Sequence, residues 1–284
     1  MLVTLFRLLS VLPLSALHAI GSALGWLVYL ASPSYRRRLK DNMARAGFGN
    51  HLPSAIREAG KNILELPFIW CAEQDRILNT VQVDNWDVVQ TALDAKRGIV
   101  FLTPHLGCFE ITAQYVATRT PLTVMYRPPR KQALKPLIEG ARARGDLRLA
   151  PATLSGVRTL LKVLRQGGPI GILPDQVPQN GEGVWAEFFG KPAYTMTLPA
   201  KLHQMSGSPI ILTYAERLPH GAGFLIRFIP FDEPMGGSAE EQARAINIAM
   251  EKLIARCPAQ YFWSYNRYKV PEGIAAPPGK TGNL

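Results

Sequence analysis

The stretch GIVFLTPHLGCFEITAQYVATRTPLTVMYR, residues 98–127, contains the pattern that decides the fold. Its first part, GIVFLTPH, is a short run of β-branched and aromatic residues, which predicts a buried strand ending at Pro104 and His105. GCFEITAQYVATRT is typical of a helix, and LTVMYR predicts a second strand. A strand, a helix and another strand in this order form the unit of a parallel sheet, so the stretch indicates an α/β fold.

The same alternation continues after this stretch. Two late segments, PIILTYAERL (209–218) and GFLIRFIPF (223–231), flank the turn signal PHGAG and predict an antiparallel pair at the edge of the sheet. We therefore expect a mixed, largely parallel central sheet flanked by helices. Further strands are expected in LRLA (147–150) and PIGILPDQ (169–176), and further helices at about 36–78, 131–145, 155–168, 198–207 and 239–256.

The N-terminus has the composition of a membrane-attached segment. From Leu8 to Ala31 the chain has no formally charged side chain, and about 20 apolar residues suffice to cross a bilayer. Because the run includes Pro13, serines and glycines, a spanning helix, an interfacial helix and a cleaved signal peptide all remain open. The basic YRRRLK that follows favours a cytoplasmic location for the rest of the chain. We expect a membrane anchor helix in 1–35, the α/β domain in 36–272 and a flexible tail in 273–284.

The charge of the chain indicates an anionic partner. Lys and Arg number 32 against 21 Asp and Glu, a net charge of +11. No zinc-finger spacing or aromatic RNA-binding signature is present, so nucleic acid is not expected. Three scattered cysteines provide neither a disulfide framework nor a metal-ligand cluster, which favours a reducing compartment. No phosphate-binding glycine loop is present, and we expect no metal and no cofactor.

His105 and Glu110 are the strongest candidates for chemistry. His105 closes a predicted strand, and Glu110 falls in the first turn of the helix that follows. A carboxylate that binds one imidazole nitrogen fixes the tautomer and leaves the other nitrogen free to accept a proton from a hydroxyl. Cys108 lies between the two residues, so a cysteine nucleophile activated by His105 is an alternative.

Four later blocks follow TPHLGCFE in a specific order: YRPPR (126–130), PDQ (174–176), FFGKPAYTMTLPAKL (188–202) and QYFWSYNRYK (260–269). In this order, and over nearly the whole chain, the sequence resembles the lipid A biosynthesis lauroyl/myristoyl acyltransferases. These belong to the lysophospholipid acyltransferase-like superfamily, whose signature is His-x4-Asp/Glu.

The resemblance implies transfer of a fatty acyl chain from acyl carrier protein to a hydroxyl of a lipid A precursor, at the cytoplasmic face of the inner membrane. It assigns His105 as general base and Glu110 as its orienting partner. It places Arg127 at the family's arginine, where a phosphate or an oxyanion would bind. Backbone N–H groups near Gly107 are the other candidate oxyanion donors. The residues expected to bind substrate are Arg127, Arg130, Asp175, Gln176, Phe189 and Gly190.

Two other functions remain open. The block EGARAR (139–144) is similar to one in glycerol-phosphate and lysophosphatidate acyltransferases, so a glycerolipid or lysophospholipid acceptor is an alternative. A catalytically silent protein that binds anionic lipid through the same fold is the second.

Overall fold

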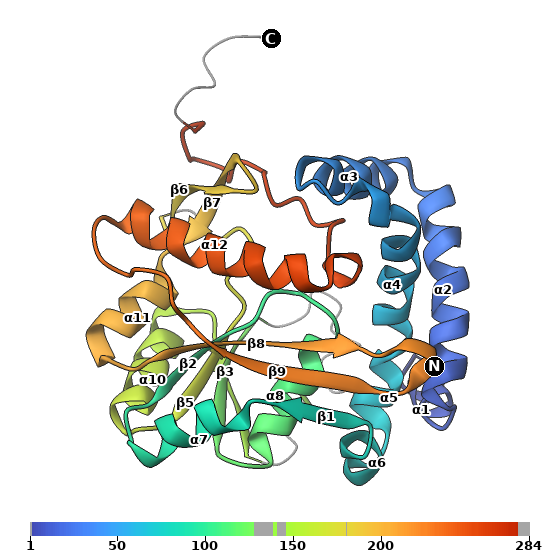
Figure 1. Cartoon of the computed structure of the whole chain (residues 1–284), viewed down its shortest axis with the longest axis horizontal. Helices are drawn as coiled ribbons and strands as arrows, with labels where there is room; N and C mark the ends of the chain where they lie inside the picture. Colours follow the sequence, from blue (N-terminus) through green and yellow to red (C-terminus); the bar gives the residue numbers. More distant parts are fainter. Residues whose placement is uncertain (1, 128–138, 141–145, 180, 278–284) are drawn as a thin grey trace.

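A computed structural model describes residues 2–127, 139–140, 146–179 and 181–277. Its centre is a seven-stranded sheet with the strand order β1-β9-β8-β2-β5-β3-β4 (Figure 1). All neighbouring strands are parallel except β8 and β9, which confirms the expected mixed, largely parallel sheet. The strands are β1 (Val81–Asp84), β2 (Ile99–Leu102), β3 (Leu122–Tyr126), β4 (Leu147–Pro151), β5 (Pro169–Ile172), β8 (Ile210–Arg217) and β9 (Phe224–Pro230).

The predicted antiparallel pair is confirmed, although its expected position is wrong. β8 and β9 pair from Ile211 with Pro230 to Arg217 with Phe224. They do not form the edge, because β1 pairs in parallel with the far side of β9. β1 is only four residues long and belongs to a segment between helices, so the sequence did not mark it as a strand.

Helices cover both faces of the sheet (Figure 1). The expected helix at 239–256 is confirmed as α12, which begins at a capping box between Ser238 and Glu241. Much of the helix expected at 131–145 lies outside the described residues. The helices are α1 (Leu2–Ser10), α2 (Leu14–Ala31), α3 (Pro33–Arg45), α4 (Leu52–Leu64), α5 (Leu66–Cys71), α6 (Gln74–Leu78), α7 (Trp86–Asp94), α8 (Phe109–Ala117), α10 (Leu154–Arg165), α11 (Leu198–Ser206) and α12 (Ala239–Arg256).

The two faces of β2 contribute to two separate hydrophobic clusters. Successive side chains of a strand point to opposite faces. Val100 and Leu102 therefore pack with residues of α10, α11 and α12. Ile99 and Phe101 pack on the other side with residues of α5, α7 and α8. β2 is buried on both faces, as expected for a central strand of a parallel sheet.

A two-stranded hairpin lies outside the central sheet. β6 (Gly183–Phe188) and β7 (Lys191–Met196) pair in antiparallel fashion, and β6 packs against α12. The turn between them consists of Phe189 and Gly190, whose φ angles are 47° and 69°. Two successive positive φ angles are typical of the tight turns that close two-residue hairpins.

The N-terminal apolar run is divided into two helices. α1 ends at Ser10, and α2 begins at Leu14 directly after Pro13. Proline has no N–H group and is tolerated only at the start of a helix, so the run of Leu8 to Ala31 is not one continuous helix. Among the residues that the structure describes, α2 is the one helix long and apolar enough to cross a membrane. The division of the chain into residues 1–35, 36–272 and 273–284 stays a prediction.

Candidate active site

The parallel pairing of β2 and β5 brings His105 and Asp175 together. Leu102, the last residue of β2, pairs with Ile172, the last residue of β5. His105 and Asp175 each follow three residues later, and both strands continue into a loop with a proline just before these residues. The carboxyl ends of neighbouring parallel strands meet at one edge of the sheet, which is where α/β proteins hold their ligands.

Asp175 holds His105 by two hydrogen bonds. The imidazole Nδ1 lies 2.8 Å from Asp175 Oδ1, and the backbone N–H of His105 donates to Oδ2 at 3.0 Å. The Asp175 side chain is only 2% exposed. Burial alone would raise the pKa of Asp175, but the charge and hydrogen bonds of His105, with the charge of Arg267, lower it. The Asp175 carboxylate is therefore ionised, and it accepts a hydrogen bond from the N–H at His105 Nδ1.

The loop that carries His105 is fixed on both sides. Gly107 donates its N–H to Gln260 O at 3.1 Å, and Cys108 donates to Ala215 O at 2.8 Å. Phe262 N in turn donates to His105 O at 3.1 Å. Gly107 has a φ of 60°, and a Cβ at this position would lie 1.9 Å from Ala215 O. Only glycine fits there, so the imidazole is held in a preorganised position.

The second imidazole nitrogen faces Gln176. His105 Nε2 lies 3.1 Å from Gln176 Nε2, and both side chains line the same cavity. With the proton on Nδ1, the Nε2 lone pair accepts from the Gln176 amide. A substrate hydroxyl that replaced this amide would donate to the same lone pair, which is the geometry of a general base.

The cavity beside His105 has a volume of about 580 Å³ and is mainly apolar. This volume lies within the range of pockets that bind small ligands. The exposed side chains of Arg127, Glu182 and Lys201 also line it, so the cavity combines apolar walls with charged groups in contact with solvent. The apolar lining includes Phe109, Ala113, Val124, Met125, Leu147, Leu154, Val157, Ile172, Leu173, Val177, Met196 and Leu198.

The structure brings four of the predicted site residues to this cavity. His105, Glu110, Arg127 and Gln176 all line it, with Glu110 buried in the first turn of α8. The carboxylate on Nδ1, however, belongs to Asp175 and not to Glu110. The structure therefore differs from the expectation that Glu110 orients the ring, because the register of two neighbouring strands places Asp175 there.

Two other predicted residues lie away from the cavity. Phe189 and Gly190 are not among the described residues that line the cavity. They form the turn of the β6–β7 hairpin, where the Phe189 ring lies tilted at 5.7 Å from the Trp263 ring and the Phe189 N–H donates to Glu251. The N–H of Gly107, a predicted oxyanion donor, is bonded to Gln260 O, and its role stays a prediction. Arg130 lies outside the described residues.

The cysteine alternative is not supported. Cys108 is buried, and burial, reinforced by the nearby charge of Glu65, raises the pKa of its thiol well above the usual range. A buried thiol of high pKa is a poor nucleophile. Across residues 2–127, 139–140, 146–179 and 181–277, no three His, Cys, Asp or Glu side chains are grouped so as to hold a metal ion.

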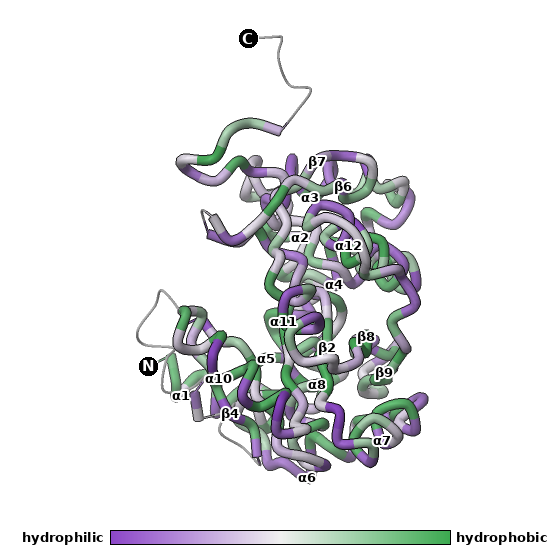
Figure 2. The backbone as a smooth tube through the Cα atoms, turned by 90° about the vertical axis from the view of Figure 1, so that its left-hand side faces the viewer, coloured by the Kyte–Doolittle hydropathy of each residue, from purple (hydrophilic) through white to green (hydrophobic). Residues whose placement is uncertain are grey.

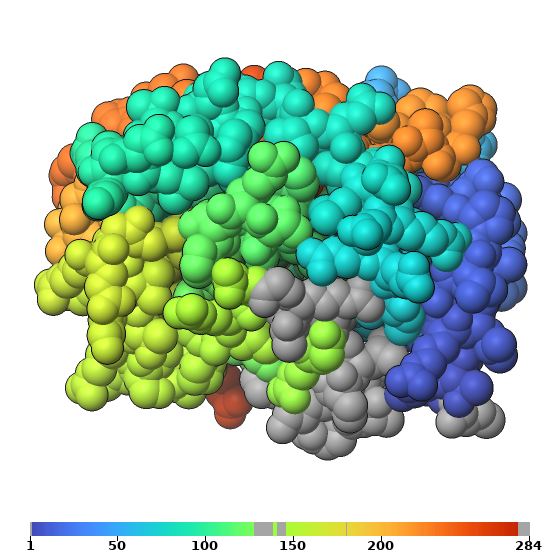
Figure 3. Space-filling view, turned by 90° about the horizontal axis from the view of Figure 1, so that it is seen from below, coloured from blue at the N-terminus to red at the C-terminus, as the bar shows by residue number. Residues whose placement is uncertain are grey.

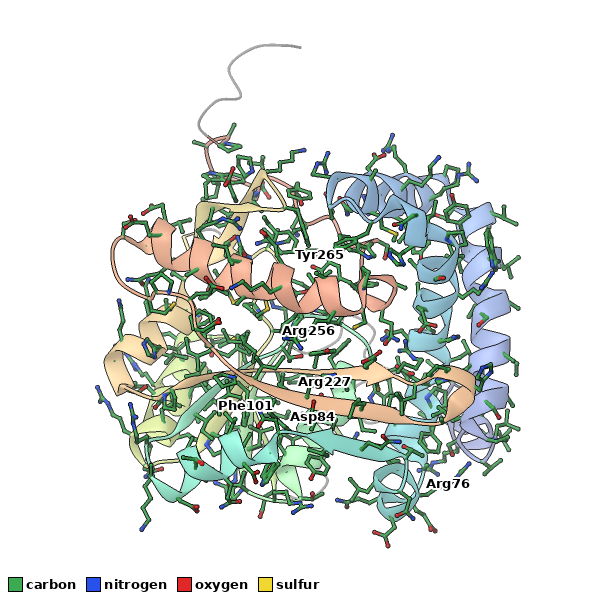
Figure 4. The ribbon with its side chains drawn as sticks, in the orientation of Figure 1. Arg76, Asp84, Phe101, Arg227, Arg256 and Tyr265 are labelled. Carbon is green, nitrogen blue, oxygen red and sulfur yellow. The ribbon has the colours of Figure 1, made fainter. Side chains whose placement is uncertain are left out.

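Sequence reasoning missed a support for Asp175 that comes from the C-terminal segment. The Tyr261 side chain interacts with the Asp175 carboxylate, and Tyr261 also forms a β-bridge with Leu106 in the His105 loop. Tyr265, labelled in Figure 4, accepts a hydrogen bond from Val177 N in the other loop. The block QYFWSYNRYK therefore connects both loops of the site. Its aromatic residues were the only signal in the sequence.

Comparison with known proteins places this chain in a family. The family model of the bacterial lipid A biosynthesis acyltransferases matches residues 1–270. The chain belongs to this family. It is 28% identical over 224 residues to the lipid A biosynthesis lauroyltransferase of Escherichia coli (strain K12), an overlap covering 77% of this chain and 72% of that protein.

Other relatives extend the match to almost the full length. The acyltransferase is 24% identical over 273 residues to the lipid A biosynthesis palmitoleoyltransferase of Escherichia coli (strain K12), covering 91% of this chain and 86% of the relative. It is 25% identical over 284 residues to a lipid A biosynthesis acyltransferase of Haemophilus influenzae, covering 94% of this chain and 88% of that relative. The resemblance of the ordered sequence blocks is thereby confirmed.

Proposed function

We propose that this lipid A biosynthesis acyltransferase moves a fatty acyl chain from acyl carrier protein to a hydroxyl of a lipid A precursor, with His105 as general base. The observation that carries the proposal is the arrangement of the imidazole. Asp175 holds Nδ1 at 2.8 Å, and the other nitrogen faces an apolar cavity of about 580 Å³. A base beside an apolar cavity suits an acceptor whose hydroxyl belongs to a lipid.

The reaction needs one proton acceptor and one group that stabilises negative charge. His105 Nε2 removes the hydroxyl proton, and the oxygen attacks the thioester carbonyl to form a tetrahedral intermediate. The intermediate expels the thiolate, which receives the proton from the imidazolium. Asp175 stabilises that imidazolium through Nδ1. A positioned base of this kind typically accelerates a reaction about 10²–10⁴-fold.

Arg127 is the proposed anion-binding group of the site. It follows β3, lines the cavity and is exposed, so it can reach either the oxyanion or a phosphate of the acceptor. An oxyanion donor is typically worth about 10²–10³-fold in rate. Gln176 and Glu110 lie on the same cavity wall and are proposed to contact the acceptor.

The charge and the N-terminal helices support a location at the inner membrane, with the catalytic domain on the cytoplasmic face. The net charge of +11 favours both an acidic carrier protein and an anionic lipid. The basic residues of α3 directly follow apolar α2, and the anionic cytoplasmic leaflet attracts basic segments beside a membrane helix.

The proposal is tested with purified protein, acyl carrier protein bearing a labelled acyl chain, and two acceptors assayed separately, a lipid A precursor and a lysophospholipid. We expect acylation of the lipid A precursor, detected by the mass of the product. His105→Ala is expected to lower this rate on the order of 10²–10⁴-fold in a protein that still unfolds cooperatively. Transfer only to the lysophospholipid contradicts the proposed acceptor, and a wild-type rate in His105→Ala contradicts the proposed base.

A further inference from the structure

The outward face of α2 is apolar along its length. Ile20, Leu27 and Leu30 are 49%, 63% and 65% exposed, and Ala19 and Ala23 are exposed beside them. Positions 20, 23, 27 and 30 recur at helical spacing, so they form one stripe on the helix surface. Leu5 and Leu8 of α1, and Val11 in the turn between α1 and α2, are exposed apolar side chains as well. Both helices form one flank of the molecule, dark blue in Figure 3.

The opposite face of α2 is packed tightly against α4. A Cβ at Gly25 would lie 2.0 Å from Ile56 O, and a Cβ at Gly60 of α4 would lie 1.9 Å from Gly21 O. Glycines on both helices therefore let the two backbones come into contact. The helices run side by side in Figure 1. α2 is in this way one wall of the folded domain.

Polar contacts also fix both N-terminal helices to the domain. Arg76 of α6 donates to the backbone oxygens of Ser10 and Leu12, between α1 and α2 (Figure 4). His18 of α2 lies 3.3 Å from Glu65, which also binds Arg217 at the end of β8. α2 is thus connected to the central sheet through a buried ion pair.

These contacts conflict with a helix that crosses the bilayer. α2 has 18 residues and is about 27 Å long, so it would need its whole length to cross a hydrocarbon core about 30 Å thick. A crossing would bring Arg57, Glu58 and Lys61 of α4 to the same depth. Each charged side chain at the centre of a bilayer costs about 2.5–3.5 kcal/mol or more.

We propose that α1 and α2 lie in the plane of the membrane surface, with their apolar stripe buried among the lipids and the domain resting on it. The occupant of this face is an anionic lipid bilayer. The charges of the neighbouring elements support this choice. Arg37, Arg38 and Lys40 are exposed on α3, which follows α2 directly and is largely purple in Figure 2. Arg7 is exposed on α1. Cationic residues beside an apolar helix face are typical of helices that lie in the interface.

This inference sharpens the membrane attachment proposed above, and its test does not depend on acyl transfer. Single cysteines replace Ala19, Ala23 and Leu27 in the full chain, in a Cys71→Ser background because Cys71 is only partly buried. Each cysteine carries a fluorophore, and the protein is bound to vesicles of phosphatidylethanolamine and phosphatidylglycerol. Nitroxide groups placed at shallow and deep positions of the lipid chains then report the depth of each label.

We expect the three labels to be quenched equally, and more strongly by the shallow nitroxide than by the deep one. Labels at depths that change steadily along α2, with one near the bilayer centre, would show a crossing helix and overturn the proposal. Absence of quenching at all three would overturn it as well, because the stripe would then face protein. Gln204→Cys on α11, on the opposite side of the molecule in Figure 1, is the unquenched control.

The role of the basic helix is tested by replacing Arg37, Arg38 and Lys40 together with Gln. Each basic residue near an anionic surface contributes enough that the triple variant is expected to bind these vesicles on the order of 100-fold more weakly. Binding to vesicles of phosphatidylcholine alone is expected to be unchanged. Equal binding of variant and wild type to the anionic vesicles would refute the anionic lipid as the occupant.

Discussion

His105 with Asp175 and His18 with Glu65 are both histidine–carboxylate pairs, and their surroundings differ. The first pair lies at a cavity, where the second ring nitrogen of His105 contacts Gln176. The second is sealed inside the domain, where His18 is 4% exposed and Glu65 is fully buried. Arg217 binds both oxygens of Glu65, at 2.6 and 2.5 Å, so this carboxylate already has a permanent cation.

The difference separates a pair that supports chemistry from a pair that supports the fold. Asp175 interacts most strongly with His105, whose other ring nitrogen faces the cavity. Glu65 is paired with an arginine, which does not lose its proton in proteins. The same two residue types therefore serve different purposes. His105 is accessible to a substrate, whereas Glu65 is buried and bound by Arg217.

The largest expected effect concerns the catalytic pair. Asp175→Asn removes the charge that stabilises the imidazolium, so kcat is expected to fall on the order of 10²–10⁴-fold with little change in KM. Glu110→Gln is the matched control, because Glu110 lies on the same cavity wall. It is expected to lower kcat by less than about 10-fold. The measurement is the steady-state kcat and KM of both purified variants, with their melting temperatures to show that they are folded. A larger loss in Glu110→Gln would restore Glu110 as the partner of His105.

A smaller effect is expected when the buried pair of His18 and Glu65, the structural pair, loses the Arg217 cation. Arg217→Met leaves Glu65 and Glu58 without the guanidinium that binds them. Breaking a buried ion pair in this way typically costs about 3–5 kcal/mol of unfolding free energy. Arg227 on neighbouring β9 pairs with Asp84 at a more exposed site (Figure 4). Arg227→Met is expected to cost at most about 1 kcal/mol. Denaturant unfolding measures both, and equal losses would contradict a special role for burial.

The strand pairing that brings His105 and Asp175 together is visible in the sequence, although its meaning is clear only from the structure. VFLTPH and IGILPD both end in Pro followed by a polar residue at the end of a buried run. The sequence predicts both strands but not that they are neighbours, because seven strands can be ordered in many ways. Once Leu102 pairs with Ile172, the contact between the two side chains follows.

Phe189 and Gly190 were assigned to the substrate site by the resemblance alone, and their residue types did not predict their true position. The block FFGKPAYTMTLPAKL identifies the family, but the same letters describe a hairpin turn with two positive φ angles. Glycine and aromatic residues are equally compatible with a cavity wall. Only the packing of Phe189 near Trp263 and its bond to Glu251 distinguish the two.

The structural pair should also have a pH dependence. Burial alone would raise the pKa of Glu65, but Arg217 and His18 lower it to about 2. The folded-state pKa is depressed, so the stabilisation is present above about pH 4.5 and is lost as the pH falls toward about 2. Each pKa unit corresponds to about 1.4 kcal/mol, which gives a loss on the order of 3 kcal/mol.

The reference for this measurement is the double variant Glu65→Gln/Arg217→Met, which removes both charges. We expect the unfolding free energy of the wild type to fall more steeply than that of the double variant between these pH values. Parallel curves would show that Glu65 does not titrate differently in the folded and unfolded states.

The smallest expected effect concerns the histidine of the structural pair. His18→Gln removes the imidazole that lies 3.3 Å from Glu65 and edge-on to Phe224, while Arg217 keeps the carboxylate paired. One net hydrogen bond is worth about 1 kcal/mol, so the unfolding free energy is expected to fall by about that amount. The rate of acyl transfer should not change, since His18 does not line the cavity. The same two measurements on His105→Gln should give a large loss of rate, together with a loss of unfolding free energy of at least about 1 kcal/mol because His105 also binds a buried carboxylate. A loss of transfer in folded His18→Gln would mean that the buried cluster reaches the catalytic loop, which it adjoins through Cys108.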